Sequence, residues 1–266
     1  MLLELEKLTP NISDPAVRDA SLRHIANSLA SLGKLEKAMA VLENVISPSE
    51  KMPVLMRTAE AQALAGDIVA ATETAHSIEA LRYRAIVLST IGIEMARSGN
   101  LNQALEILLT AIDARQGIQY SFTRDYASSR IALAYGKIAF TNDVFNIEIF
   151  NKAITTAKDI NDQQLHAKTI WMLAFYRLDS GGALANETKD QAIAATGNIE
   201  STTSQAWLLA DLSEQRAKSG KAIWAKEIYD ISLNIVRSIK SSWGRARVLA
   251  KLSQALMALA ESPANK

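Results

Sequence analysis

The amino-acid sequence predicts an all-α protein in which antiparallel helix pairs repeat along the chain to form a solenoid. Prolines and glycines are few, 5 and 11 in 266 residues. This scarcity is typical of long helices joined by short turns, because both residues weaken helix interiors. Apolar residues recur at helical spacing, as in Leu22, Ile25 and Leu29. Three similar turns, SLGKLEKA, LAGDIVAA and RSGNLNQA, also follow one another at a constant interval.

The first three units share columns of small residues. Glycines 33 residues apart close the first helices, alanines follow them five residues later, and other small residues precede them by seven. These columns are Gly33, Gly66 and Gly99; Ala38, Ala71 and Ala104; and Ala26, Ala59 and Gly92. We predict a left-handed backbone at the glycines that close the helices, and close contact between helices at the other small residues.

The repeat continues to the end of the chain with wider spacing. Large–small pairs keep the frame at Ile131-Ala132, Leu173-Ala174, Leu212-Ser213 and Leu252-Ser253, at intervals of 42, 39 and 40 residues. The predicted units run over 15–46, 51–78, 80–114, 122–160, 161–197 and 200–238, followed by a final capping helix at 243–261. We expect longer connections at 114–121, 140–146 and 179–190. The sequence therefore predicts one domain over 1–266, with regular repeats over 15–114 and degenerate repeats over 122–262.

This pattern resembles the tetratricopeptide repeat, which has a large–small pair, a turn glycine and an early alanine in its second helix. The segment from Arg84 to Ala114 matches best, with Gly92, Gly99 and Ala104 in the expected columns. The proline that normally closes each repeat of that family has no counterpart here. The resemblance implies a right-handed superhelix of about seven helix pairs whose first helices line a concave groove. It also implies a non-enzymatic adaptor or scaffold that binds another protein or a peptide in that groove.

The groove columns of that family, carried onto this sequence, give the candidate binding residues. They are Arg23, Asn27, Arg57, Glu60, Arg97, Lys137, Trp171, Phe175, Trp207, Glu214, Lys218 and Arg247. Trp171 and Phe175 are four residues apart and share a helix face. If they are exposed, they form with Trp207 a patch that anchors apolar side chains of a partner. The alternative is that they pack between units, as most aromatic residues do.

Some members of that family bind a C-terminal carboxylate with basic and amide side chains. Arg23, Asn27 and Arg57 occupy three such columns here, whereas the third unit has Ile86 and Thr90 where further basic residues are expected. The sequence therefore predicts an incomplete carboxylate clamp.

Charge and residue types limit the other functions. The net charge of +1 disfavours a general polyanion binder, so we do not expect nucleic acid as a partner. A basic segment keeps a helical-repeat RNA-binding protein open as an alternative; it contains Arg237, Lys240, Arg245, Arg247 and Lys251. A regulatory or accessory domain of a larger enzyme, or of a secretion or assembly complex, is a further alternative.

No residues suggest catalysis. The absence of cysteine excludes thiolate catalysis and cysteine metal sites. The three histidines, His24, His76 and His166, fall in different units, so they do not form a ligand set. We therefore expect no enzyme activity, no cofactor and no metal site.

The last expectations concern location and assembly. The sequence has no stretch of 18 apolar residues, and its start carries Glu4 and Glu6 with no basic segment of a secretory signal. We expect a cytoplasmic protein without membrane insertion, and a periplasmic or secreted mature form stays open. A homo-oligomer is also open, because an incompletely capped solenoid end or the aromatic patch could pair two copies.

Overall fold

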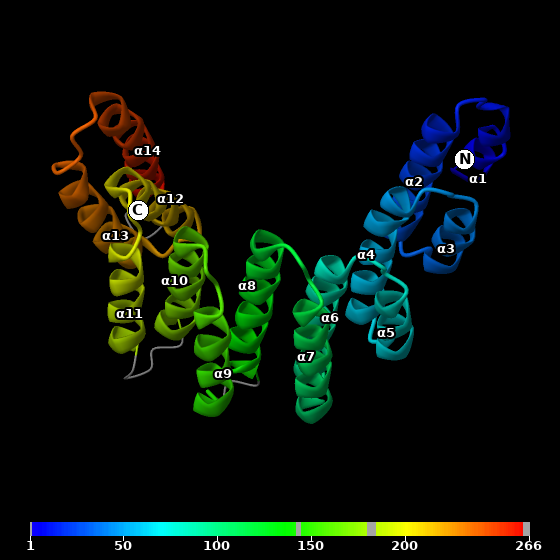
Figure 1. Ribbon diagram of the computed structural model, residues 1–266, viewed down its shortest axis with the longest axis horizontal. Coiled ribbons are helices and arrows are strands. Elements are labelled where there is room, and N and C mark those ends of the chain that lie inside the picture. Colours follow the sequence, from blue (N-terminus) through cyan, green and yellow to red (C-terminus); the bar gives the residue numbers. More distant parts are fainter. Residues whose placement is uncertain (1, 142–144, 180–184, 263–266) are drawn as a thin grey trace. The chain divides into compact units, whose positions relative to one another are not determined.

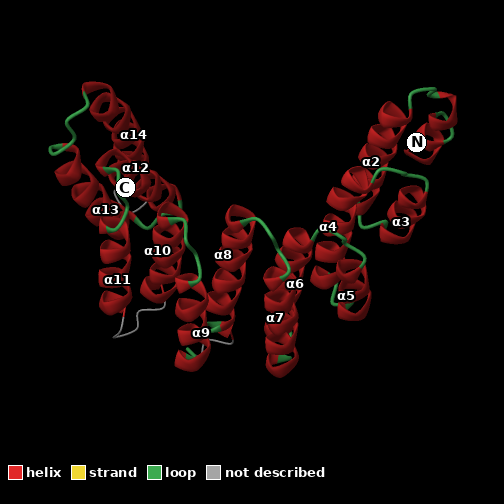
Figure 2. Ribbon diagram, viewed as in Figure 1, coloured by secondary structure: helices red, strands yellow, loops and turns green. Residues whose placement is uncertain are grey.

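The computed structural model describes residues 2–141, 145–179 and 185–262, and it confirms the predicted all-α class (Figure 2). These residues form fourteen α-helices and one short 3₁₀ helix. Successive helices pack as antiparallel pairs, in the order expected of a helical repeat. The helices group into two compact units, residues 1–161 and 162–266. That the chain is one domain over 1–266 stays a prediction.

The first unit contains four helix pairs (Figure 1). They follow α1 (Leu2–Glu6) and the 3₁₀ turn η1 (Thr9–Asn11), which the sequence did not predict. The pairs are α2 (Pro15–Ser31) with α3 (Leu35–Glu43), α4 (Pro48–Leu64) with α5 (Ile68–His76), α6 (Leu81–Arg97) with α7 (Leu101–Gln116), and α8 (Ser121–Ile138) with α9 (Ile147–Lys158). The first helices also pack on one another in succession, α2 on α4, α4 on α6 and α6 on α8.

The second unit contains two pairs and a final helix. These are α10 (Gln163–Asp179) with α11 (Ala185–Gly197), α12 (Thr202–Lys218) with α13 (Ala222–Val236), and α14 (Ser242–Glu261), which packs on both α12 and α13. The predicted final helix at 243–261 is confirmed.

One of the three predicted long connections is short, and the other two lie partly outside the described residues. The connection at 114–121 is short, because α7 continues to Gln116 and α8 begins at Ser121. Helix α11 begins at Ala185, inside the loop predicted at 179–190, and residues 180–184 of that loop lie outside the described residues. Residues 142–144 of the connection predicted at 140–146 also lie outside them.

The glycine turns have the predicted backbone. The φ angles of Gly33, Gly66 and Gly99 are 70°, 84° and 86°, and Gly220 repeats the turn in the second unit at 74°. At the first of these turns the N–H of Gly33 donates to Ala30 O, and the next N–H donates to Leu29 O. This pair of bonds satisfies the last carbonyls of the helix, and it needs a residue that tolerates positive φ.

The columns of small residues lie where helices approach most closely. Ala26, Ala38 and Ala104 are fully buried. A Cβ atom on Gly92 would lie 3.1 Å from Cδ2 of Leu108 in α7. The small residues therefore set the spacing between the two helices of a pair.

A further column joins each pair to the next, and the sequence analysis missed it. It consists of one buried aliphatic residue before each of α4, α6, α8, α10, α12 and α14: Val45, Ile78, Ile118, Ile160, Ile199 and Ile239. In four of these places a side chain six residues later donates to the aliphatic residue's carbonyl. The donors are Arg84 (2.8 Å), Arg124 (3.3 Å), Gln205 (2.7 Å) and Arg245 (2.6 Å). In α6, α8, α12 and α14 these bonds fix the first turns of the helix to the connection before it.

Candidate binding surfaces

Each inner first helix exposes one narrow stripe of side chains. Helix α6 packs against α7 and against the first helices on both sides, which buries most of its surface. Thr90, Ile93, Glu94 and Arg97 remain exposed or half-buried, and their spacing of three and four residues places them on one face. The matching stripes carry Arg57 and Glu60 on α4 and Arg130 and Lys137 on α8. We call six ionisable residues the charged surface of the first unit: Arg57, Glu60, Glu94, Arg97, Arg130 and Lys137.

The side chains of this surface share one electrostatic field. Burial raises the pKa of Glu60, and the guanidinium groups of Arg130 and Arg57 oppose that rise. Burial lowers the pKa of Lys137; Arg130 and Arg97 lower it further, while Glu94 raises it. Three predicted residues, Glu60, Arg97 and Lys137, are therefore brought together from α4, α6 and α8. Sequence reasoning missed Arg130, although its place seven residues before Lys137 puts both on one helix face.

Positive charge is in excess on the charged surface. Glu94 accepts a hydrogen bond from Arg97 at 2.5 Å, and Arg57 donates to the neutral hydroxyl of Ser31 at 2.6 Å. Within the described residues, Glu60, Arg130 and Lys137 form no hydrogen bond and no ion pair. Four cations thus face two carboxylates, and only one of those carboxylates is paired. An anionic group that approaches Arg130 and Lys137 meets unsatisfied donors.

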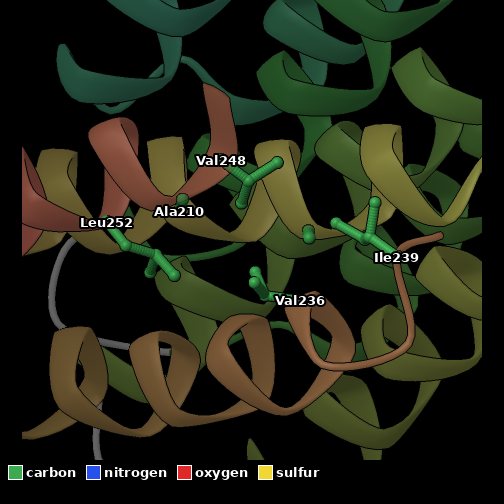
Figure 3. Close-up of a cluster of buried hydrophobic side chains, with 6 residues drawn as sticks. Ala210, Val236, Ile239, Val248 and Leu252 are labelled. Carbon is green, nitrogen blue, oxygen red and sulfur yellow. The ribbon is translucent and has the colours of Figure 1, made fainter. Parts of the chain in front are cut away.

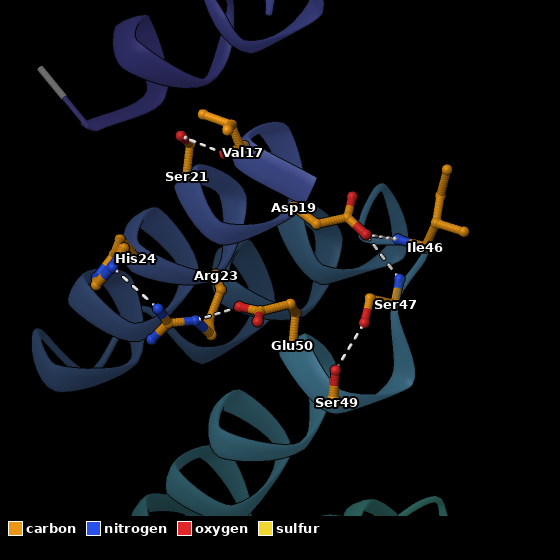
Figure 4. A network of polar contacts seen from close by, with 9 residues as sticks. All are labelled: Val17, Asp19, Ser21, Arg23, His24, Ile46, Ser47, Ser49 and Glu50. Atoms are coloured by element: carbon orange, nitrogen blue, oxygen red, sulfur yellow. Dashed lines mark hydrogen bonds and ion pairs between the residues drawn. The ribbon is translucent and has the colours of Figure 1, made fainter. Parts of the chain in front are cut away.

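The predicted carboxylate clamp is already occupied on one side (Figure 4). Nε of Arg23 lies 2.5 Å from Oε2 of Glu50, and the same guanidinium contacts Nε2 of His24 at 3.0 Å. Oδ1 of Asn27 is buried and has no hydrogen-bond partner among the residues that the structure describes. Arg23, one of the three predicted clamp residues, is therefore already paired within the chain. Nearby Asp19 accepts from the backbone N–H groups of the connection to α4, which is a structural role.

Trp171 and Phe175 do not lie on a binding surface, and this corrects the exposed aromatic patch considered from the sequence. They are 1% and 2% exposed. Nε1 of Trp171 donates to Oγ1 of Thr196 in α11 at 2.8 Å, and the guanidinium of Arg216 lies 4.5 Å from the ring centre of Phe175. The large aromatic surfaces face the neighbouring helices because burial there removes them from water. The alternative, that they pack between repeat units, is confirmed for Phe175, which contacts Arg216 of the next pair, while Trp171 bonds within its own pair.

The predicted residues Trp207 and Arg247 do meet, on α12 and α14. The guanidinium of Arg247 lies 4.5 Å from the ring centre of Trp207 and 5.5 Å from that of Trp243. Trp207 is half-buried, whereas Trp243 is 71% exposed. These contacts are cation–π interactions. We call these three residues the aromatic surface of the second unit. Trp243 was missed because it precedes the columns carried over from the family.

The acidic groups beside the aromatic surface are satisfied within the chain. Glu214 is buried and receives hydrogen bonds from Lys218 at 2.5 Å and Lys251 at 2.6 Å. These bonds hold the pKa of Glu214 below its ordinary value. Nζ of Lys251 also lies 2.8 Å from Asp211, and its bonds to the two carboxylates outweigh burial and raise its pKa. Glu214 was predicted as a groove residue, but its carboxylate is closed to a ligand.

Comparisons with known proteins place the chain in no family. No known protein family and no curated protein matches it. Among solved structures it is similar to Ton1535 from Thermococcus onnurineus NA1, with 15% identity over 93% of this chain and 94% of that one. The TM-score is 0.30, so no site is carried over from that structure. The class that the fold defines is an all-α protein of sequential helix pairs.

Two further findings bear on function. Among the described residues, no group of three or more His, Cys, Asp or Glu side chains is placed to hold a metal ion. In the same part of the chain no helix is long and apolar enough to cross a membrane.

Proposed function

We propose that this protein is a non-enzymatic adaptor that binds an acidic peptide segment of another protein on the charged surface of the first unit. We also propose that its helix pairs are degenerate tetratricopeptide-like repeats. Four features support the second proposal: the left-handed glycine turns, the buried alanine columns, the tight contact at Gly92 and the stacking of successive first helices.

The observation that carries the adaptor proposal is the excess of cations on the charged surface, where Arg130 and Lys137 form no hydrogen bond and no ion pair within the described residues. Lys137 is exposed; partial burial and the guanidinium groups of Arg130 and Arg97 lower its pKa, while Glu94 raises it. A peptide carboxylate placed beside it would restore the pKa of Lys137 and also satisfy the donors of Arg130. The affinity for an acidic peptide therefore includes the pairing of two cations, Lys137 and Arg130, that have no partner in the described part of the free protein.

The rigidity of the helix stack also favours peptide binding. The charged surface is built on α4, α6 and α8, which are fixed to one another by buried side chains. A preformed surface of this kind does not need to be ordered when the ligand binds, so more of the interaction energy appears as affinity.

The test is a titration of the protein with an Asp/Glu-rich peptide, followed by fluorescence anisotropy. We expect binding that weakens as salt is added, and a loss of at least about tenfold, or about 1.4 kcal/mol, for Lys137→Glu. The matched control is Lys152→Glu, which reverses an exposed lysine on the second helix of the same pair. No binding at low salt, or equal losses in the two variants, would rule out this site.

A second candidate, single-stranded RNA, is favoured by one specific observation. Phe122 and Tyr126 are 66% and 42% exposed, and they continue the stripe of α8 that carries Arg130 and Lys137. Aromatic rings that alternate with cations can stack on bases and contact phosphates. We favour the peptide because the net charge of the chain is only +1, which gives little of the general attraction to phosphate on which single-strand binding depends. RNA that binds at near-physiological salt, and more tightly than the acidic peptide, would reverse this order.

A further inference from the structure

The last helix, α14, has one packed face and one open face. Val248 and Leu252 lie in a hydrophobic cluster with Ala210 of α12 and Val236 of α13 (Figure 3). The opposite face carries seven exposed residues spaced three or four apart: Ala246, Leu249, Ala250, Ser253, Leu256, Met257 and Ala260. None of the seven is charged. We call them the open face of α14.

The same columns are buried in an earlier first helix. Counted from the large–small pair, Leu249 corresponds to Leu88 of α6 and Leu256 corresponds to Met95. Leu88 and Met95 are 0% and 6% exposed, whereas Leu249 and Leu256 are 42% and 51% exposed. In α6 these columns are covered by α7 and the next first helix. Among the described residues no helix covers them in α14, so this helix presents an apolar surface of a kind that α6 buries.

We propose that the open face of α14 is a homodimer interface, on which α14 of a second copy packs antiparallel about a two-fold axis near Ser253. The residues of the open face can pack against themselves in this arrangement. In this register Ala250 lies opposite Leu256 of the second copy, Ala246 lies opposite Ala260 and Leu249 lies opposite Met257, so uncharged residues meet along the whole contact. A two-fold contact also closes on itself and leaves no apolar surface to recruit a third copy.

The charges of α14 favour the antiparallel arrangement. Arg247 lies in the first turns of the helix and Glu261 is its last residue. With 3.6 residues per turn, both lie along the same edge of the open face. Antiparallel packing therefore brings Glu261 of each copy beside Arg247 of the other, whereas in a parallel two-fold pair the same edges of the two helices lie on opposite sides of the contact. Trp243, at the same edge and 71% exposed, would be covered by the second copy.

The size of the face limits the strength of the dimer. A helix of 20 residues is about 30 Å long. One helix pair of this length buries an area at the low end of the range for specific interfaces. We therefore expect a weak dimer that forms as the protein concentration rises.

Analytical ultracentrifugation of the full chain over a wide concentration range tests the proposal. The mass should rise from that of a monomer towards that of a dimer. Leu256→Asp should weaken the dimer at least about tenfold without loss of helix content, because Leu256 is exposed. Asn234→Asp, at an exposed position on α13, is the control and should change nothing. A chain that stays monomeric at every concentration, or a dimer unaffected by Leu256→Asp, overturns the proposal and leaves the face to a different occupant.

Charge exchange tests the antiparallel register. Arg247→Glu and Glu261→Arg should each weaken self-association, because each places like charges side by side. A mixture of the two variants should form a dimer again, because every glutamate then meets an arginine. Failure of the mixture to associate contradicts this register.

A single introduced thiol provides a second measurement. The chain contains no cysteine. Ser253→Cys should therefore form a disulfide-linked dimer under mild oxidation, because the two thiols meet near the axis. Asn234→Cys should stay monomeric. Equal cross-linking of the two variants would reject the proposed axis.

Discussion

The two units both have charged side chains on their first helices, but these charges are paired within the chain in the second unit and partly unpaired in the first. In the first unit, Lys137 and Glu60 are partly desolvated and form no hydrogen bond within the described residues. In the second, Glu214 is held by two lysines, and Lys251 joins it to Asp211. A satisfied network stabilises the fold and offers little to a ligand, whereas an unsatisfied one gains from binding. This difference is why we place the binding site in the first unit.

The largest expected effect separates the two tryptophans that the sequence assigned to one surface. Trp171→Ala should destabilise the protein by about 3–5 kcal/mol, because it empties a large buried volume and removes the hydrogen bond to Thr196. Trp207 is only half-buried, so Trp207→Ala should cost clearly less. Urea unfolding of the two variants measures the difference. Equal losses would mean that Trp171 is not the core residue described above.

A smaller difference in stability is expected between variants of Glu214 and Glu60. Glu214→Gln should lower stability at neutral pH by about 1–3 kcal/mol, because it weakens bonds from two ammonium groups to a buried carboxylate. The folded-state pKa of Glu214 lies below its ordinary value of 4.5. Its contribution is therefore present above that value and is lost as the pH falls through the folded-state pKa. The variant should lose part of the acid sensitivity of the wild type, as measured by unfolding between neutral and acid pH.

The smallest expected change in stability is that of Glu60→Gln, and it is a gain rather than a loss. The folded-state pKa of Glu60 lies above 4.5, so ionisation of this group costs stability as the pH rises through that range. Glu60→Gln should therefore leave stability unchanged or raise it by less than about 1 kcal/mol at neutral pH. The measurement is the free energy of unfolding at neutral pH, compared between Glu60→Gln and Glu214→Gln. A destabilisation as large as that of Glu214→Gln would show that Glu60 has partners like those of Glu214.

The periodic features of the fold could be read from the sequence. A turn such as that at Gly33, or an alanine column such as that of Ala38, depends on residues close together in the chain, and it repeats. The helix pairs followed from these columns, and so did the final helix.

The features that depend on the rotation of a helix or on distant residues could not be predicted. Phe175 shows this: counted from the large–small pair, it shares a column with half-buried Ile93 of α6, but it is 2% exposed because Arg216 of α12 lies over its ring. The link from Lys251 to Asp211 joins residues 40 positions apart and has no local signal. The aliphatic column at Ile78 and Ile118 was visible in the sequence as a spacing, but its meaning lies in the hydrogen bonds to its carbonyls.

The most direct test of the contrast between the units is an NMR titration of the lysine side chains with the acidic peptide. Our account predicts that the Lys137 resonance shifts with saturation and that its pKa rises on binding, while the resonances of Lys218 and Lys251 stay unchanged. A shift at Lys218 or Lys251 with none at Lys137 would contradict the account and place the binding site in the second unit.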